Sequence, residues 1–236
     1  MLIKEYLQDH FIKETKEDMH IHPRPDCFSV NVLCKYIDLS LTLGIHNIGF
    51  VEHGKRISKN HQGILTTEDD IIRFAKAVET VGRNYASKNI SIRCGIEIDY
   101  SDEASFVQNV IQMCNKTEKL DYIIGSVHGF SKKTYKEYLD ATTNLIEKYD
   151  IDILGHFILS QDISKYNYEI DNIFNILRDK NISLELNKAA RYDCSDKEIK
   201  SYICEKIIMN GINFSFGSDA HSYLELITNN KRKWFS

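Results

Sequence analysis

The sequence predicts an α/β fold in which seven parallel β-strands alternate with helices and close into a barrel. Short apolar segments rich in β-branched residues recur along the 236 residues, and a longer amphipathic stretch follows each one. A repeat length of roughly 30 to 40 residues is typical of parallel βαβ units. Segments such as IGFV and YIIG are almost continuously apolar, which predicts strands buried on both faces.

The expected elements alternate without a break. Strands are predicted at residues 18–22, 47–52, 90–98, 122–127, 151–155, 182–187 and 213–217. Helices are predicted at residues 30–43, 68–87, 104–116, 133–149, 168–179 and 196–210, and a final helix from Ser222. Thr67 and Asp70 form a capping box at the start of the second helix, and Asn210-Gly211 predicts the end of the sixth. Because no linker interrupts this order, we expect one domain over residues 1–236.

Seven such units favour a barrel over an open doubly wound sheet of the flavodoxin or Rossmann type, although the periodicity alone fits either. A Rossmann sheet would need a Gly-rich phosphate loop after its first strand, and the sequence there is HIHPRP.

Composition excludes several classes of partner. The net charge is −4, which gives no electrostatic case for nucleic acid or an anionic membrane. No apolar run approaches the roughly 18 residues of a membrane span, and charges interrupt the N-terminal segment, so we expect a cytoplasmic protein. The six cysteines are scattered without a CxxC pair, which favours buried thiols over disulfides or a zinc–thiolate site. Only Cys27, five residues after His22, keeps a chance of lining a site.

Side chains with metal-binding chemistry stand at the end of six of the seven expected strands or just after it. In chain order they are His20 and His22, His53, Glu97, His128, His156, and Asp219 with His221. The carboxyl ends of parallel barrel strands meet on one face, and imidazole and carboxylate groups bind zinc, manganese and iron. These residues are too many for one ion, so the sequence predicts a cluster in which Glu97 bridges two metals. His10, His46 and His61 are not expected to bind metal.

Six motifs occur in an order that resembles the PHP (polymerase and histidinol phosphatase) superfamily, above all its histidinol-phosphatase-type members. They are DMHIH, EHG, GIEIDY, IIGSVH, ILGH and FGSDAH, between residues 18 and 221. The resemblance implies a distorted seven-stranded (β/α)7 barrel with two or three divalent transition metals (zinc, manganese or iron). Carried over by position, the implied ligands are His20, His22, His53, Glu97, His128, His156, Asp219 and His221.

Two positions depart from the family pattern. Phe28 stands where members usually have a further histidine or aspartate ligand, for which Asp26 or Glu52 could substitute. Ile158 stands where many members have the aspartate of GHxD, so that corner lacks a carboxylate.

The resemblance implies a metal-dependent phosphatase of a small phosphorylated metabolite, first L-histidinol phosphate, with a place in histidine biosynthesis. The implied reaction is attack by a metal-bridging hydroxide, with Asp219, His221 and Glu97 as catalytic groups. Guanidinium groups suit phosphate, so Arg191, Arg24 and Arg56 are the expected substrate-binding residues, whereas Lys188 fits a solvated surface position better. The alternatives are a phosphoesterase of nucleotides, phosphosugars or phosphotyrosine peptides, and a non-catalytic metal-binding regulatory domain. The sequence does not predict the oligomeric state.

Overall fold

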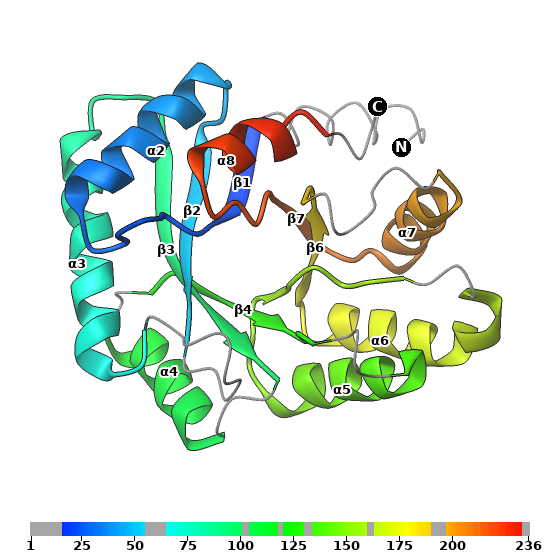
Figure 1. The fold of residues 1–236 in the computed structure, drawn as a ribbon. Helices are drawn as coiled ribbons and strands as arrows, with labels where there is room; N and C mark the ends of the chain where they lie inside the picture. Colours follow the sequence, from blue (N-terminus) through cyan, green and yellow to red (C-terminus); the bar gives the residue numbers. More distant parts are fainter. Residues whose placement is uncertain are drawn as a thin grey trace.

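The chain folds into a nearly closed parallel barrel surrounded by helices, as the sequence predicts (Figure 1). The computed structural model describes residues 16–54, 65–100, 104–117, 120–129, 134–159, 163–189 and 197–232. Seven strands form one sheet in the order β1 to β7, and every neighbouring pair is parallel. This sequential order confirms the barrel and excludes the doubly wound sheet, whose strand order reverses.

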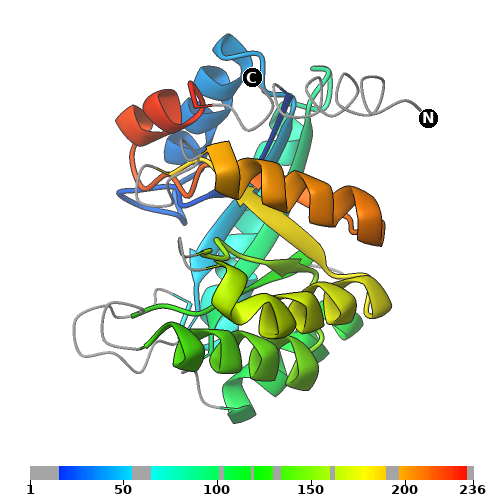
Figure 2. The same cartoon turned by 90° about the vertical axis from the view of Figure 1, so that its right-hand side faces the viewer.

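The strands are β1 (Glu17–Ile21), β2 (Asn47–His53), β3 (Ser91–Asp99), β4 (Tyr122–Ser126), β5 (Ile153–Leu154), β6 (Ser183–Asn187) and β7 (Phe214–Gly217). The helices in the described ranges are α2 (Val30–Thr42), α3 (Glu68–Asn84), α4 (Ala104–Thr117), α5 (Tyr135–Lys148), α6 (Asn167–Asp179), α7 (Lys197–Asn210) and α8 (Tyr223–Asn229). Helix α8 lies beside α2 over the junction of β1 and β7, while α5 and α6 lie side by side at the other end of the molecule (Figures 1 and 2).

The first and last strands meet at their carboxyl ends. His22 N donates a hydrogen bond of 2.9 Å to Ala220 O. Asp18 Oδ1 accepts a bond of 2.9 Å from Ser218 N, and Glu17 Oε1 accepts one of 3.1 Å from Phe216 N. At this junction, two side-chain carboxylates of β1 accept hydrogen bonds from β7 backbone N–H groups, in place of the backbone carbonyls of a regular parallel pair.

A separate apolar cluster fills the barrel interior below the strand ends. It consists of Met19, Val51, Tyr122, Ile124 and Ile153. The Tyr122 hydroxyl donates to Met19 O at 2.7 Å. A Cβ atom at Gly95 would lie 2.6 Å from the Tyr122 ring, so glycine is required where this ring crosses the barrel. The interior is therefore a packed core that separates the two ends of the barrel.

Two elements differ from the expectation. Strand β5 contains two residues instead of five, because Asp152 Oδ2 accepts the hydrogen bond of Ile123 N (2.7 Å) in place of a backbone carbonyl. A 3-10 helix, η2 (Ile163–Tyr166), precedes α6. No helix in the described ranges is long and apolar enough to cross a membrane.

Replacing Thr67 by alanine is expected to lower the free energy of unfolding by about 1 kcal/mol. The predicted capping box is confirmed: Thr67 Oγ1 accepts from Asp70 N at 3.2 Å, and Asp70 Oδ2 accepts from Thr67 N at 3.1 Å. Slight burial raises the pKa of Asp70, but the hydrogen bonds from Thr67 and Thr66 outweigh it and hold the pKa below 3.8. The contribution of Asp70 is therefore complete above its unfolded pKa and is lost as the pH falls through its lower folded value.

Urea unfolding of the wild-type protein and of Thr67→Ala, at pH values on both sides of the Asp70 titration, measures the change in the free energy of unfolding. Thr80→Ala, in the middle of the same helix, is the matched control and should be neutral or slightly stabilising. An equal loss of unfolding free energy in Thr67→Ala and Thr80→Ala would show that the capping box does not stabilise the protein.

Candidate metal centre

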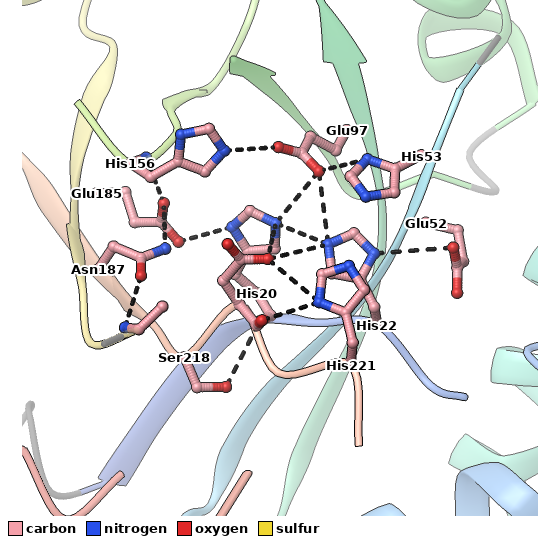
Figure 3. Close-up of polar contacts among 12 residues, drawn as sticks. His20, His22, Glu52, His53, Glu97, His156, Glu185, Asn187, Ser218 and His221 are labelled. Atoms are coloured by element: carbon pink, nitrogen blue, oxygen red, sulfur yellow. Dashed lines mark hydrogen bonds and ion pairs between the residues drawn. The ribbon is translucent and has the colours of Figure 1, made fainter. Parts of the chain in front are cut away.

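All eight residues predicted as metal ligands gather at the carboxyl end of the barrel. Figure 3 shows six of them by name around a shared centre, with their side chains directed toward one another. Each comes from the end of a strand or from the first residues after it: His20, His22, His53, Glu97, His128, His156, Asp219 and His221. Most of them are buried; the side chains of His128 and His221 are 20% and 32% exposed.

Glu97 lies at the middle of this group and presents its two oxygens to different imidazoles. Oε2 lies 2.7 Å from His53 Nδ1 and 3.5 Å from the Nε2 atoms of His20 and His22. Oε1 lies 3.0 Å from His156 Nε2 and 3.3 Å from His128 Nε2. This is the arrangement expected of a carboxylate shared by two cations.

The donor atoms around Glu97 fit metal ions. His20 Nε2 and His22 Nε2 are 3.0 Å apart, and Asp219 Oδ1 lies 3.5 Å from the latter. Three groups of residues each bring three ligand atoms within 4.8 Å of one another: His20, His22 and Glu97; His53, Glu97 and His128; and His22, His53 and His221. Glu97 Oε2 is buried without an aligned hydrogen bond in the described part of the chain. A buried carboxylate oxygen among imidazole nitrogens is suited to a divalent cation.

Two further carboxylates orient these imidazoles from outside. Glu185 Oε1 lies 2.7 Å from His20 Nδ1, and its Oε2 accepts from His156 N at 2.6 Å. Asp99 Oδ2 forms a hydrogen bond with His128 Nδ1. A carboxylate on Nδ1 fixes the proton there and leaves Nε2 free to face the centre.

Glu185 is a residue of the centre that the sequence did not predict, and the sixth strand was expected to contribute no site residue. The signal was present in the SLELN segment, where polar residues alternate with leucines: Ser183, Glu185 and Asn187. Asn187 Nδ2 donates to Glu185 Oε2 at 3.0 Å and so holds it in place. All seven strands therefore contribute polar groups to this end of the barrel.

Charges within the centre shift pKa values strongly. Burial raises the pKa of Glu97, but the neighbouring His53, His128 and His20 outweigh it and hold it well below its ordinary value. Burial lowers the pKa of His128, but Glu97 and Asp99 outweigh it and raise it to about 9. Burial, followed by the charge of His22, lowers the pKa of His221 to about 4. Protons and metal ions therefore compete for the nitrogens around Glu97.

Two of the three described non-glycine residues with positive φ lie in the centre. They are His156 (φ = 30°) and Asp219 (φ = 51°), whereas the third, Asn181, precedes β6. Non-glycine residues seldom adopt this left-handed region. His156 contacts Glu97 from this conformation. Asp219 likewise contacts His22.

Other predicted residues have different surroundings. Arg24 Nη2 lies 3.1 Å from Glu52 Oε2, near the centre, whereas Arg191, Arg56 and His61 fall outside the described residues. His46 directly precedes β2, at the end of the barrel opposite to the centre, and its Nδ1 is 2.7 Å from Asn89 O. Cys27 is buried, and burial followed by the charge of Glu52 raises the pKa of its thiol to about 12.

The two departures from the family pattern remain without carboxylates. Asp26 does not substitute for Phe28, because Asp26 is exposed and accepts a hydrogen bond from Phe28 N (2.9 Å). The Phe28 ring packs 4.4 Å from the guanidinium carbon of Arg73. Ile158 is fixed through its backbone, since its N donates to the Tyr138 hydroxyl at 2.9 Å.

The expectation that Lys188 is solvated is wrong. Lys188 is fully buried, and its Nζ lies 3.1 Å from Asn230 Oδ1. Burial raises the pKa of Asp18, and the charge of Lys188 opposes this effect. Lys188 thus balances a buried carboxylate that helps to join β1 and β7, which explains why it is drawn into the interior.

Together, this fold and site define a parallel βα barrel with a candidate metal centre at the carboxyl end of its strands. The family model described as the PHP domain matches residues 18–189, and the chain belongs to this family. Its fold is similar to a histidinol phosphate phosphatase from Lactococcus lactis subsp. lactis Il1403, solved with zinc, L-histidinol and phosphate (TM-score 0.69, 17% identity, 94% of this chain and 92% of that one). An Arabidopsis N6-mAMP deaminase is much less similar (TM-score 0.45, 9% identity, 97% and 76%). A search of curated proteins returned no match.

Proposed function

We propose that the chain is a metal-dependent phosphomonoesterase of a small phosphorylated metabolite, with L-histidinol phosphate as the first substrate to test. The observation that carries this proposal is the position of Glu97, whose two oxygens face different imidazole nitrogens. Two cations bridged in this way suit in-line displacement at phosphorus. Membership of the PHP domain family and the fold shared with a phosphatase that binds zinc, L-histidinol and phosphate support the same reaction class.

In this proposal the eight strand-end residues hold two or three divalent ions. Such ions lower the pKa of a coordinated water and stabilise charge on the attacking and leaving oxygens. Asp219 or His221 would accept a proton from the attacking water and return a proton to the leaving oxygen. His221 Nδ1 lies 3.0 Å from Asp219 O, which orients the ring, and the side chain is 32% exposed and so is open to a substrate. Arg24, Arg191 and Arg56 bind the phosphate, and zinc, manganese and iron are the metals to test.

Removing the metals is expected to lower phosphate release by about 10³-fold, because divalent ions supply several kcal/mol of charge stabilisation. The protein is purified without a chelator and its bound metals are counted. Phosphate release is then measured, with and without EDTA, from L-histidinol phosphate, a nucleoside monophosphate, a phosphosugar and a phosphotyrosine peptide. Restoring each metal separately identifies the active ion.

Two results would contradict the proposal. Less than one equivalent of bound transition metal would remove its basis. Full metal with no release from any substrate would favour a non-catalytic metal-binding domain, the alternative suggested by the missing carboxylates at Phe28 and Ile158. Phosphate release from another compound of the panel, and not from L-histidinol phosphate, would support the proposed reaction with a different substrate.

A further inference from the structure

Glu52 is a buried carboxylate beside the centre to which neither the ligand set nor the outer pairs assigns a role. It is fully buried at the end of β2, and its Oε2 lies 3.7 Å from His22 Nδ1. Among the described residues, His22 Nδ1 and the Glu52 oxygens have no aligned hydrogen bond, although Glu52 Oε2 forms an ion pair of 3.1 Å with Arg24 Nη2. A buried ring nitrogen without a hydrogen bond is costly, and here it faces a carboxylate across a gap slightly longer than a hydrogen bond. Figure 3 shows Glu52 on the side of His22 away from His20.

The position of Glu52 is unsuitable for a direct metal ligand. No described group of three ligand atoms within 4.8 Å includes Glu52. His22 already presents its other nitrogen, Nε2, to the centre, at 3.0 Å from His20 Nε2 and 3.5 Å from Glu97 Oε2. Glu52 therefore meets His22 on the opposite side of the ring.

The same arrangement occurs twice more in the centre. Glu185 faces Nδ1 of His20, and Asp99 faces Nδ1 of His128, while Nε2 of each ring points inward. Glu52 and His22 would be the third such pair. Of the three pairs, theirs is the one whose distance, 3.7 Å, exceeds that of a hydrogen bond. Arg24 accounts for this difference, because its Nη2 lies 3.1 Å from the same Oε2 that faces His22.

We infer that Glu52 is a positioning residue that accepts a hydrogen bond from His22 Nδ1–H when Nε2 binds a metal, while Arg24 balances its charge. This inference rests on the metal centre of the proposed function and not on phosphate hydrolysis. An outer carboxylate fixes the tautomer and the orientation of a metal-binding histidine, and its loss typically weakens metal binding by about 10- to 100-fold.

The test measures metal binding by the full chain with cobalt(II) and zinc(II) alone. The first variant is Glu52→Leu, which removes the acceptor. The second is the double variant Arg24→Met/Glu52→Leu, which replaces a partly buried ion pair by apolar groups and so leaves no unpaired charge to disrupt folding. Glu79→Gln, in an exposed pair with Arg83, is the matched control. Both Glu52 variants should bind about 10- to 100-fold more weakly at unchanged stoichiometry.

Imidazole ¹⁵N spectra of the zinc-loaded proteins provide a second readout. The wild-type chain should show a slowly exchanging His22 Nδ1 proton that both Glu52 variants lack. Affinities and spectra equal to those of the control would overturn the inference, leaving Glu52 as the counter-ion of Arg24. Loss of one metal equivalent at saturation would also overturn it, because Glu52 would then be a ligand. Weakened binding in a chain without phosphatase activity would support the inference and contradict the proposed function.

Discussion

Replacing Glu97 by glutamine should empty the metal centre and lower phosphate release by about 10³-fold. Glutamine keeps the shape of the side chain but loses the negative charge and one of the two carboxylate oxygens. Because Oε2 and Oε1 face different imidazoles, a single amide oxygen cannot replace both. His128 would also lose the main charge that raises its pKa, and His20 would lose one of two such charges, the larger being that of Glu185. We therefore expect the variant to bind less metal and to retain almost no activity.

Metal analysis and the phosphate-release assay measure the two effects on the same samples. Glu79→Gln makes the same chemical change on the exposed face of α3 and should leave both unchanged. A Glu97→Gln protein with full metal content and full rate would refute a bridging role for this carboxylate.

Replacing Gly217 by alanine is expected to destabilise the barrel by about 1–3 kcal/mol, the usual effect of overpacking a core. A methyl group there would overlap Glu185 Oε1 and would lie 2.6 Å from His20 Cβ. Glu185 would have to leave its position 2.7 Å from His20 Nδ1. The same change should therefore weaken metal binding by about 10- to 100-fold, because His20 loses its outer carboxylate.

Urea unfolding and zinc titration separate these two consequences. The chain offers a matched control in Gly82, which lies in α3 and has no atom within 4 Å of the position of an added Cβ. Gly82→Ala should leave zinc affinity unchanged and stabilise the protein by about 0.5–1 kcal/mol. Normal zinc affinity in Gly217→Ala would show that Glu185 does not position His20.

The fold and the gathering of the eight strand-end residues at one rim could be predicted because their signals are local. Alternating apolar and amphipathic segments locate the strands, and the polar residue that follows each strand locates the rim of the barrel. The ends of the strands were less predictable where a side chain accepts a hydrogen bond in place of a backbone carbonyl, as Asp152 does beside β5.

The outer residues depend on contacts between distant strands, which no local pattern encodes. Glu185 meets His20 across 165 residues of sequence. Lys188 resembles a surface lysine until Asp18 is placed beside it in the fold. Glu52 is adjacent to His53, and nothing in the EHG segment indicates that its carboxylate faces His22.

The junction of β1 and β7 has a consequence for the order of events during synthesis. Asp18 and Ser218, which join there, are 200 residues apart, and His20 and Asp219 beside them belong to the same centre. A growing chain on the ribosome carries the first two imidazoles long before Asp219 exists. Two of the three groups of candidate ligands are complete once the chain has reached His128, whereas the third needs His221, so the complete centre exists only when the last strand has joined the first.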